Sequence, residues 1–212
     1  MSAIVVVLAD GPERPVVIDA PAGATVIAAD GGAELAQLLG LELDVVVGDL
    51  DSISAETLAG IEQVERHPVE KDATDLELAL VTALRFEPER ILVVGGAGGR
   101  LDHLLGGLLL LAAEFLAGVR VDAQFGAAAV HVIRGDRTLV GEPGELISLL
   151  AVHGAADGVV TEGLVYPLRG ESLVPGSTRG VSNVFAEAEV HVRLDRGVLI
   201  AIRPSGSVTA GS

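Results

Sequence analysis

Acidic side chains gather in three short segments, each just past a hydrophobic run or at the start of a predicted helix. The segments are Gly48-Asp49-Leu50-Asp51-Ser52, Lys71-Asp72-Ala73-Thr74-Asp75 and Gly98-Gly99-Arg100-Leu101-Asp102-His103. Carboxylates packed within a few ångströms of one another repel and take up protons unless a metal ion or basic groups neutralise them. The three segments therefore predict a Mg²⁺ site that faces phosphates.

The first segment offers two metal ligands. Positions i and i+2 of an extended chain point to the same side, so Asp49 and Asp51 can reach one ion together. Mg²⁺ prefers oxygen ligands and takes one or two carboxylates, with water and substrate phosphate in its other positions. The structural alternative is that both aspartates are turn and N-cap residues before a helix at Ala55.

The second segment carries the single lysine of the chain. Thirteen of the fourteen basic residues are arginine, so Lys71 stands out beside its aspartates. A compact ammonium is not interchangeable with a planar guanidinium at a phosphate, which indicates a functional role for Lys71. The structural alternative is a capping box, with Thr74 as N-cap, Glu77 at N3 and Asp75 favoured by the helix dipole.

The third segment is glycine-rich and precedes a predicted helix, so its backbone N–H groups can hold an anion. Neither the dinucleotide-binding fingerprint nor the Walker A motif fits, because Leu101 and Arg100 stand where these motifs require other residues. The structural alternatives are a surface ion pair between Arg100 and Asp102 and, for His103, an ordinary histidine at a helix start.

The composition limits what can surround these segments. A net charge of -16 and an aromatic content of 2% argue against a nucleic-acid partner, because basic surfaces hold phosphate backbones and aromatic side chains stack on bases. The absence of cysteine favours a reducing compartment, so we expect a cytoplasmic protein. We expect no membrane segment: residues 3–9 lack signal-peptide features, and residues 104–119, too short to span, predict a buried helix.

The first half of the chain predicts an α/β domain. Valine- and isoleucine-rich runs at residues 4–8, 25–29, 44–47 and 91–94 are typical of buried strands, and residues 33–39, 55–61 and 76–84 show helical spacing of apolar residues. This alternation indicates a mostly parallel sheet with helices on both faces. Such domains bind ligands outside the carboxyl ends of their strands, where Asp30, Asp49, Asp51 and the glycine-rich run fall.

After about residue 125 the chain changes to short strands separated by glycines, at residues 129–133, 137–140, 145–150, 186–194 and 198–202. Asp195-Arg196-Gly197 predicts a hairpin between the last two, and His131 and His191 are expected to face solvent. We therefore predict an α/β domain at residues 1–124, an all-β sandwich at residues 125–204 and a flexible tail at residues 205–212.

In this order and spacing, the segments resemble the thiamine pyrophosphokinase family. The resemblance spans almost the whole chain and also includes Ala29-Asp30-Gly31-Gly32-Ala33, Gly163-Leu164-Val165-Tyr166-Pro167-Leu168 and Gly180-Val181-Ser182-Asn183. It implies an α/β domain followed by a β-sandwich, and a homodimer with thiamine bound where the subunits meet. It also implies Mg²⁺-dependent transfer of a diphosphate group from ATP to the hydroxyethyl group of thiamine, with release of AMP.

The resemblance implies roles for single residues as well. The metal ligands would be Asp49, Asp51 and Asp75. The residues around the nucleotide would be Asp30, Gly31, Lys71, Gly98, Gly99, Arg100, Asp102 and His103. The residues near thiamine would be Thr74, Asp75, Tyr166, Ser177, Ser182 and Asn183. Catalysis would rest on the metal ligands with Lys71 and Asp102, and either Asp75 or Asp102 would accept the hydroxyl proton.

The sequence departs from the family pattern at Glu34, Leu50, Gly107 and Val184, where the family usually has Asn, Phe, Asn and an acidic residue. None of these positions is a proposed metal ligand or phosphate-binding cation. Two alternatives stay open: a related diphosphotransferase with another alcohol acceptor or nucleotide donor, and a non-catalytic nucleotide- or thiamine-binding module. Catalysis is favoured because every proposed ionic group is present.

Overall fold

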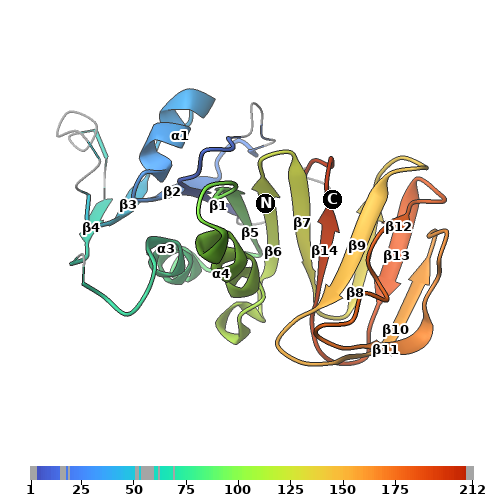
Figure 1. The fold of residues 1–212 in the computed structure, drawn as a ribbon. Helices are drawn as coiled ribbons and strands as arrows, with labels where there is room; N and C mark the ends of the chain where they lie inside the picture. Colours follow the sequence, from blue (N-terminus) through green and yellow to red (C-terminus); the bar gives the residue numbers. More distant parts are fainter. Residues whose placement is uncertain are drawn as a thin grey trace. The chain divides into compact units, whose positions relative to one another are not determined.

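The computed structural model describes residues 4–14, 18, 20–50, 53, 60–61, 63–68 and 70–208. The chain forms two compact units, shown in Figure 1. The first contains the described residues up to Leu110 together with Ala123–Gly126, and the second contains Leu111–Asp122 and the described residues from Ala127 onward. Asp51 and most of the predicted helix at residues 55–61 lie outside the described residues.

The first unit is built around a parallel sheet of β1 (Ile4–Ala9), β2 (Thr25–Ala29), β3 (Val45–Gly48), β4 (Gln63–Arg66) and β5 (Arg90–Gly95). The strands lie in the order β5-β1-β2-β3-β4, and each neighbouring pair is parallel. All but β4 are almost wholly buried, as expected of strands covered on both faces. The polar strand β4 forms an edge and was not predicted.

The helices of this unit cover both faces of the sheet, which confirms the predicted α/β class. α1 (Gly32–Leu39) connects β2 to β3, α3 (Asp75–Leu84) connects β4 to β5, and α4 (Leu101–Leu111) follows β5. In Figure 1, α1 lies on one side of the sheet and α3 and α4 lie on the other. The β2-to-β3 and β4-to-β5 connections run in opposite directions along the sheet, so right-handed crossovers place their helices on opposite faces.

The strand order creates a topological switch point between β1 and β5. After β1 the chain continues to β2 on one side, and after β5 it continues through α4 to β6 (Arg120–Phe125), which follows β5 on the other side. In open α/β sheets the carboxyl ends of strands at such a point border the ligand crevice. The segments after β1 and β5 are therefore where a nucleotide is expected.

The second unit is a sandwich of two antiparallel sheets, as predicted. One sheet has the order β12-β9-β14-β7 and the other β11-β10-β13-β8. Their bounds are β7 (Ala128–Ile133), β8 (Asp136–Val140), β9 (Leu146–Ala151), β10 (Ala156–Glu162), β11 (Arg169–Leu173), β12 (Asn183–Val184), β13 (Glu189–Arg193) and β14 (Leu199–Arg203). Apolar side chains from both sheets form one core.

Two predictions for this unit are wrong. β13 pairs with β8 and β10, whereas β14 pairs with β7 and β9, so residues 195–197 carry the chain between sheets and do not close a hairpin. A tight turn between two alternating strands is compatible with a hairpin within one sheet and with a connection from one sheet to the other. The packing of the core decides which of the two forms. His131 is fully buried because its position on β7 faces the sandwich interior, whereas His191 is exposed, as predicted.

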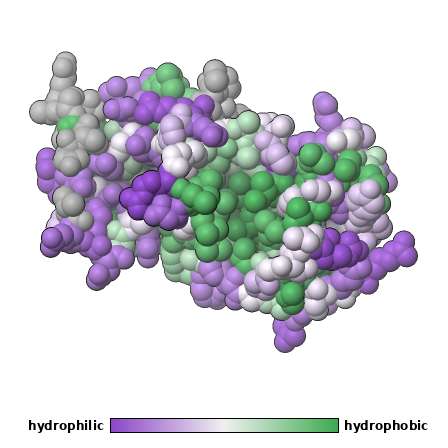
Figure 2. Space-filling model, in the orientation of Figure 1, coloured by the Kyte–Doolittle hydropathy of each residue, from purple (hydrophilic) through white to green (hydrophobic). Residues whose placement is uncertain are grey.

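The predicted buried helix at residues 104–119 is confirmed as a helix over residues 104–111, but its length and its burial are wrong. α4 ends at Leu111, Ala113 adopts an extended conformation, and a short 3-10 helix (Glu114–Leu116) follows. Leu101, Leu105 and Leu109, one stripe of α4, are 76%, 55% and 36% exposed, and Figure 2 shows hydrophobic side chains on this surface. No helix in the described part of the chain has the length and apolar character needed to cross a membrane. Val208 is buried, so ordered packing continues into residues 205–208.

Candidate functional site

Three aspartates lie in segments at the carboxyl end of the parallel sheet. Asp30 follows β2 and Asp49 follows β3, and Asp75 begins α3. A Cβ atom on Gly48 would lie 3.0 Å from the Cβ of Asp30 and 3.2 Å from Oδ1 of Asp75. The side chains of Asp30 and Asp75 therefore both approach Gly48, directly before Asp49. We call Asp30, Asp49, Lys71 and Asp75 the open cluster.

The backbone around the open cluster is strained. Asp30 has φ 41° and Leu50 has φ 64°, although neither is glycine, and Gly48 has φ 152°. The backbone N–H of Asp30 donates to the carbonyl oxygen of Val47 at 2.8 Å, which fixes the end of β2 against β3. Such conformations cost about 1–3 kcal/mol each and concentrate at ligand sites. A side chain at Gly48 would displace both neighbouring aspartates.

Lys71 completes the open cluster. Its Nζ lies 2.5 Å from Oδ1 of Asp75, and the two side chains are 14% and 31% exposed. Thr74 caps α3 by accepting a hydrogen bond from the N–H of Glu77 at 3.2 Å. The predicted N-cap role of Thr74 is thus confirmed. The cap also fixes the position of Asp75 in the first turn of α3.

The glycine-rich loop after β5 lies beside the segment after β1. Gly96, Gly98 and Gly99 have φ of 72°, 78° and 67°, and the N–H of Glu13 donates to the carbonyl oxygen of Ala97 at 3.2 Å. A Cβ on Gly98 would lie 2.8 Å from Cγ of Pro12. The loop needs glycine both for its conformation and for this close approach, and it lies at the switch point between β1 and β5.

Arg100 and Asp102 form the predicted ion pair at the start of α4. The guanidinium donates to both carboxylate oxygens of Asp102, at 3.2 and 2.6 Å, and both side chains are exposed. These hydrogen bonds lower the pKa of Asp102 to about 2. A carboxylate this acidic is a weak proton acceptor near neutral pH. His103 is exposed in the first turn of α4.

Sequence reasoning missed a second charged group at the same sheet edge, formed by Asp10, Arg14 and Glu34. Asp10 follows β1, and a Cβ on Gly31 would lie 3.0 Å from its side chain. Nη2 of Arg14 lies 3.0 Å from a carboxylate oxygen of Glu34 and 3.5 Å from one of Asp10. Asp30 was selected because it is a polar residue directly after a buried strand. Asp10 meets the same criterion.

The open cluster has the donor chemistry that Mg²⁺ requires. Its potential ligands are carboxylate oxygens, and Mg²⁺ needs only one or two of them. Within the part of the chain that the structure describes, no three His, Asp or Glu side chains are arranged to hold a metal ion. The third predicted ligand, Asp51, lies outside that part. Asp49 and Asp75 match, in type and number, the carboxylates that Mg²⁺ usually takes from a protein.

The residues expected near thiamine are divided between the two units. Thr74 and Asp75 belong to the first. In the second, a hollow of about 570 Å³ is lined by Val165, Tyr166, Pro167, Arg169, Glu171, Arg179, Val181, Ser182 and Asn183. Ser177 lies in the turn after β11, where its Oγ accepts a hydrogen bond from the N–H of Arg179 at 3.2 Å. Three of the predicted residues thus share one hollow.

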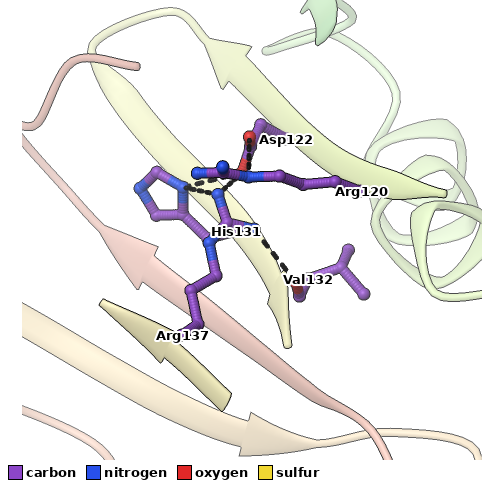
Figure 3. Close-up of polar contacts among 5 residues, drawn as sticks. All are labelled: Arg120, Asp122, His131, Val132 and Arg137. Atoms are coloured by element: carbon purple, nitrogen blue, oxygen red, sulfur yellow. Dashed lines mark hydrogen bonds and ion pairs between the residues drawn. The ribbon is translucent and has the colours of Figure 1, made fainter. Parts of the chain in front are cut away.

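A different charged group lies inside the second unit (Figure 3). Oδ1 of Asp122 lies 2.5 Å from Nη2 of Arg137 and 2.8 Å from Nδ1 of His131. The side chains of Asp122 and His131 are fully buried and that of Arg137 is 8% exposed. Burial lowers the pKa of His131, so the imidazole is neutral and donates from Nδ1 to the carboxylate. We call Asp122, His131 and Arg137 the buried cluster.

Comparisons with known proteins agree with this architecture. The family model "Thiamin pyrophosphokinase, catalytic domain" matches residues 22–121, and "Thiamin pyrophosphokinase, vitamin B1 binding domain" matches residues 130–199. A thiamine pyrophosphokinase of Bacillus subtilis is 30% identical over 167 residues, which cover 74% of this chain and 76% of the relative.

Solved structures give the same result. The crystal structure of thiamine pyrophosphokinase from Bacillus subtilis has a TM-score of 0.81 at 25% identity, covering 96% of this chain and 99% of that one. A thiamin pyrophosphokinase family protein from Enterococcus faecalis has a TM-score of 0.81 at 26% identity, covering 98% and 100%. With both family domains matched in order along one chain, this chain belongs to the thiamin pyrophosphokinase family.

Proposed function

We propose that the open cluster carries the diphosphate transfer from ATP to thiamine that defines the family. The observation that supports this most is the approach of Asp30 and Asp75 over Gly48, with Lys71 bound to Asp75. Separate segments bring acidic groups and the single lysine to one sheet edge. Carboxylates for a metal and an ammonium for a phosphate are the groups that diphosphate transfer needs.

In this proposal Asp49, Asp51 and Asp75 hold Mg²⁺, which when bound neutralises charge on the transferred phosphates. Lys71 and Arg100 add positive charge, and the N–H groups of the loop at Gly98 and Gly99 hold phosphate oxygens. The remaining nucleotide residues are Asp30, Gly31, Asp102 and His103. The strained, glycine-dependent loops support this assignment, because they present backbone N–H groups at the switch point of the sheet.

The reaction requires the thiamine hydroxyl oxygen to attack the β-phosphorus of ATP in line with the departing AMP oxygen. A new O–P bond forms, the bond to AMP breaks, and the hydroxyl proton passes to a carboxylate. Asp75 and Asp102 are the two candidate acceptors, and the ion pair with Arg100 weakens Asp102 as a base by lowering its pKa to about 2. Asp102 then serves to orient Arg100. Positioning and charge neutralisation supply most of the rate enhancement.

Thiamine is proposed to occupy the hollow at Tyr166, with Ser182 and Asn183. Thr74 and Asp75 are the acceptor residues proposed for the first unit. Ser177 belongs to the same set through its turn. The hollow carries three exposed apolar side chains, those of Val165, Tyr166 and Val181. Their exposure supports the proposal that a substrate ring or the second subunit of a homodimer covers the hollow. We place the enzyme in the cytoplasm.

The direct test is to incubate the protein with ATP, Mg²⁺ and thiamine and to measure AMP and thiamine diphosphate. Both products are expected in equal amounts, and Asp51→Asn should abolish them while the protein stays folded by circular dichroism. AMP release with another alcohol but not with thiamine would favour the related diphosphotransferase. Binding without any turnover would favour the non-catalytic module and contradict the proposal.

A further inference from the structure

We infer that Asn183 and Thr161 are positioning residues that clamp the main chain at Tyr166 and at Leu168, so that the ring of Tyr166 is a fixed recognition surface for the acceptor. The inference rests on the proposed function only in taking that acceptor to be thiamine. It assigns Asn183 an indirect role and gives Thr161 a role that the sequence did not indicate.

The side chain of Asn183 is bound to the main chain of Tyr166 in both directions. Its Oδ1 accepts from the N–H of Tyr166 at 3.1 Å, and its Nδ2 donates to the carbonyl oxygen of Tyr166 at 2.7 Å. Oδ1 also accepts from the N–H of Val184 at 2.9 Å. Three of the four hydrogen bonds that an asparagine amide can make are therefore used inside the protein. Asn183 is 3% exposed, which leaves little of it for a ligand.

Thr161 fixes the chain on the other side of the Tyr166-Pro167 pair. Its Oγ1 accepts from the N–H of Leu168 at 2.8 Å, and its own N–H donates to the carbonyl oxygen of Leu168 at 3.0 Å. Thr161 is also 3% exposed. Pro167 restricts the backbone between these two anchor points, because its ring fixes φ and it has no N–H to donate. The segment from Tyr166 to Leu168 is held at both ends by buried side chains.

The ring that this clamp presents is itself exposed. Tyr166 is 59% exposed and lines the hollow of about 570 Å³, where it is the one aromatic side chain. Ser182, directly before Asn183, has φ 57° and donates its N–H to Oγ of Ser148 at 3.1 Å. A strained residue held in place beside the clamp is typical of a preorganised site. Fixing an exposed aromatic side chain in advance reduces the ordering that binding would otherwise require.

The composition of the chain offers a direct readout. Tyr166 is the single tyrosine and there is no tryptophan, so tyrosine fluorescence comes from this residue alone. We expect high fluorescence anisotropy in the wild type without ligand, and a lower anisotropy in Asn183→Ala and in the near-isosteric Thr161→Val. Unchanged anisotropy in both variants, with the fold intact by circular dichroism, would overturn the clamp. Thr161→Val keeps the test possible if Asn183→Ala fails to fold.

Kinetics separate positioning from direct contact. We expect Asn183→Ala to raise the KM for thiamine about 10-fold, with kcat and the KM for ATP nearly unchanged. In a Tyr166→Ala background, Asn183→Ala should have no further effect on KM, because the group that it positions is gone. Additive effects of the two substitutions would show a direct contact from Asn183 and would overturn its positioning role.

Two outcomes separate the recognition role of Tyr166 from the activity of the enzyme itself. If the wild type forms AMP from ATP and thiamine but Tyr166→Ala keeps the wild-type KM for thiamine, the recognition role is overturned and the proposed function stands. If the wild type forms no AMP, the proposed function fails, and the anisotropy measurement still decides whether the clamp exists. Ser172→Ala, on the exposed side of β11, is the matched control and should change neither readout.

Discussion

The open cluster and the buried cluster are both made of carboxylates and cations, yet they differ in access. In the open cluster Asp75 is 31% exposed and lies beside backbone with positive φ. In the buried cluster Asp122 is fully enclosed, with Arg137 and His131 against its Oδ1. The carboxylate of the first cluster is therefore open to solvent, whereas that of the second is enclosed by protein groups. The charges of a cluster alone therefore do not identify a substrate-binding site. The exposure of the cluster to solvent must be considered as well.

The energetics differ in the same way. A buried ion pair contributes little compared with an apolar replacement, but the loss of one partner is costly because the other charge stays buried. Partly exposed charges can be re-solvated, so their loss affects chemistry more than folding. We therefore expect substitutions in the buried cluster to change stability and those in the open cluster to change turnover.

The largest effect is expected from Asp122→Asn. It leaves the guanidinium of Arg137 buried without its carboxylate, and should lower the free energy of unfolding by about 3–5 kcal/mol. Urea unfolding followed by circular dichroism measures this change. Activity per folded molecule should stay near wild type. The exposed Asp136, at the start of β8, offers the control Asp136→Asn, which should shift stability little. Equal free energies of unfolding for the two variants would contradict a structural role of the buried cluster.

Asp49→Asn should produce the opposite pattern. We expect AMP formation to fall about 10²–10³-fold, the loss typical when one preorganised electrostatic interaction is removed from an active site, with the thermal midpoint nearly unchanged. The matched control is Asp44→Asn at the other end of β3, where Oδ2 of Asp44 accepts a hydrogen bond from the N–H of Val26 at 2.7 Å. The control should keep its turnover. A Tm loss in Asp49→Asn as large as the activity loss would indicate a structural role.

Lys71→Arg sharpens the contrast between the two kinds of cation. A guanidinium cannot reproduce the compact ammonium at a phosphate, so we expect kcat to fall about 10-fold even though the charge is kept. Steady-state assays of AMP release measure this. The control is Arg85→Lys, since Arg85 forms an exposed ion pair with Glu65. If Lys71→Arg is as active as the control, Lys71 acts only as a structural counter-charge of Asp75.

The smallest expected effect is a pH dependence of stability from His131. Burial lowers its pKa in the folded state, so the unfolded chain takes up the proton first as the pH falls. Stability should be fully present above a pH of about 6.5 and decline below it, by at most about 1.4 kcal/mol per pH unit from this group. Unfolding of wild type and His131→Gln at several pH values measures the difference. Parallel curves would contradict a neutral buried imidazole.

Much of the fold could be predicted because local patterns and tertiary structure agree. The runs at Ile4, Thr25 and Ile91 form buried parallel strands, and the carboxyl-end rule placed Asp30 and Asp49 correctly at one edge. The polar strand β4 was missed because an edge strand, exposed along most of its length, has little hydrophobic signal.

The errors concern features that depend on long-range packing. His131 alternates with apolar neighbours, and only the arrival of Arg137 from the other sheet and of Asp122 shows that its side faces the core. The bond between Asn183 and the main chain of Tyr166, seventeen positions away, is likewise invisible in the sequence. Arg14 and Glu34 meet across two strand ends, which spacing along the chain does not reveal.

We propose that the open cluster binds a divalent ion together with the nucleotide phosphates. Electron paramagnetic resonance of Mn²⁺, with an ATP analogue that cannot transfer its diphosphate group, tests this binding, because Mn²⁺ shares the oxygen preference of Mg²⁺. We expect wild type and Asp44→Asn to bind Mn²⁺ alike and Asp49→Asn to bind it at least about 10-fold more weakly. Equal Mn²⁺ affinity in all three proteins would contradict it.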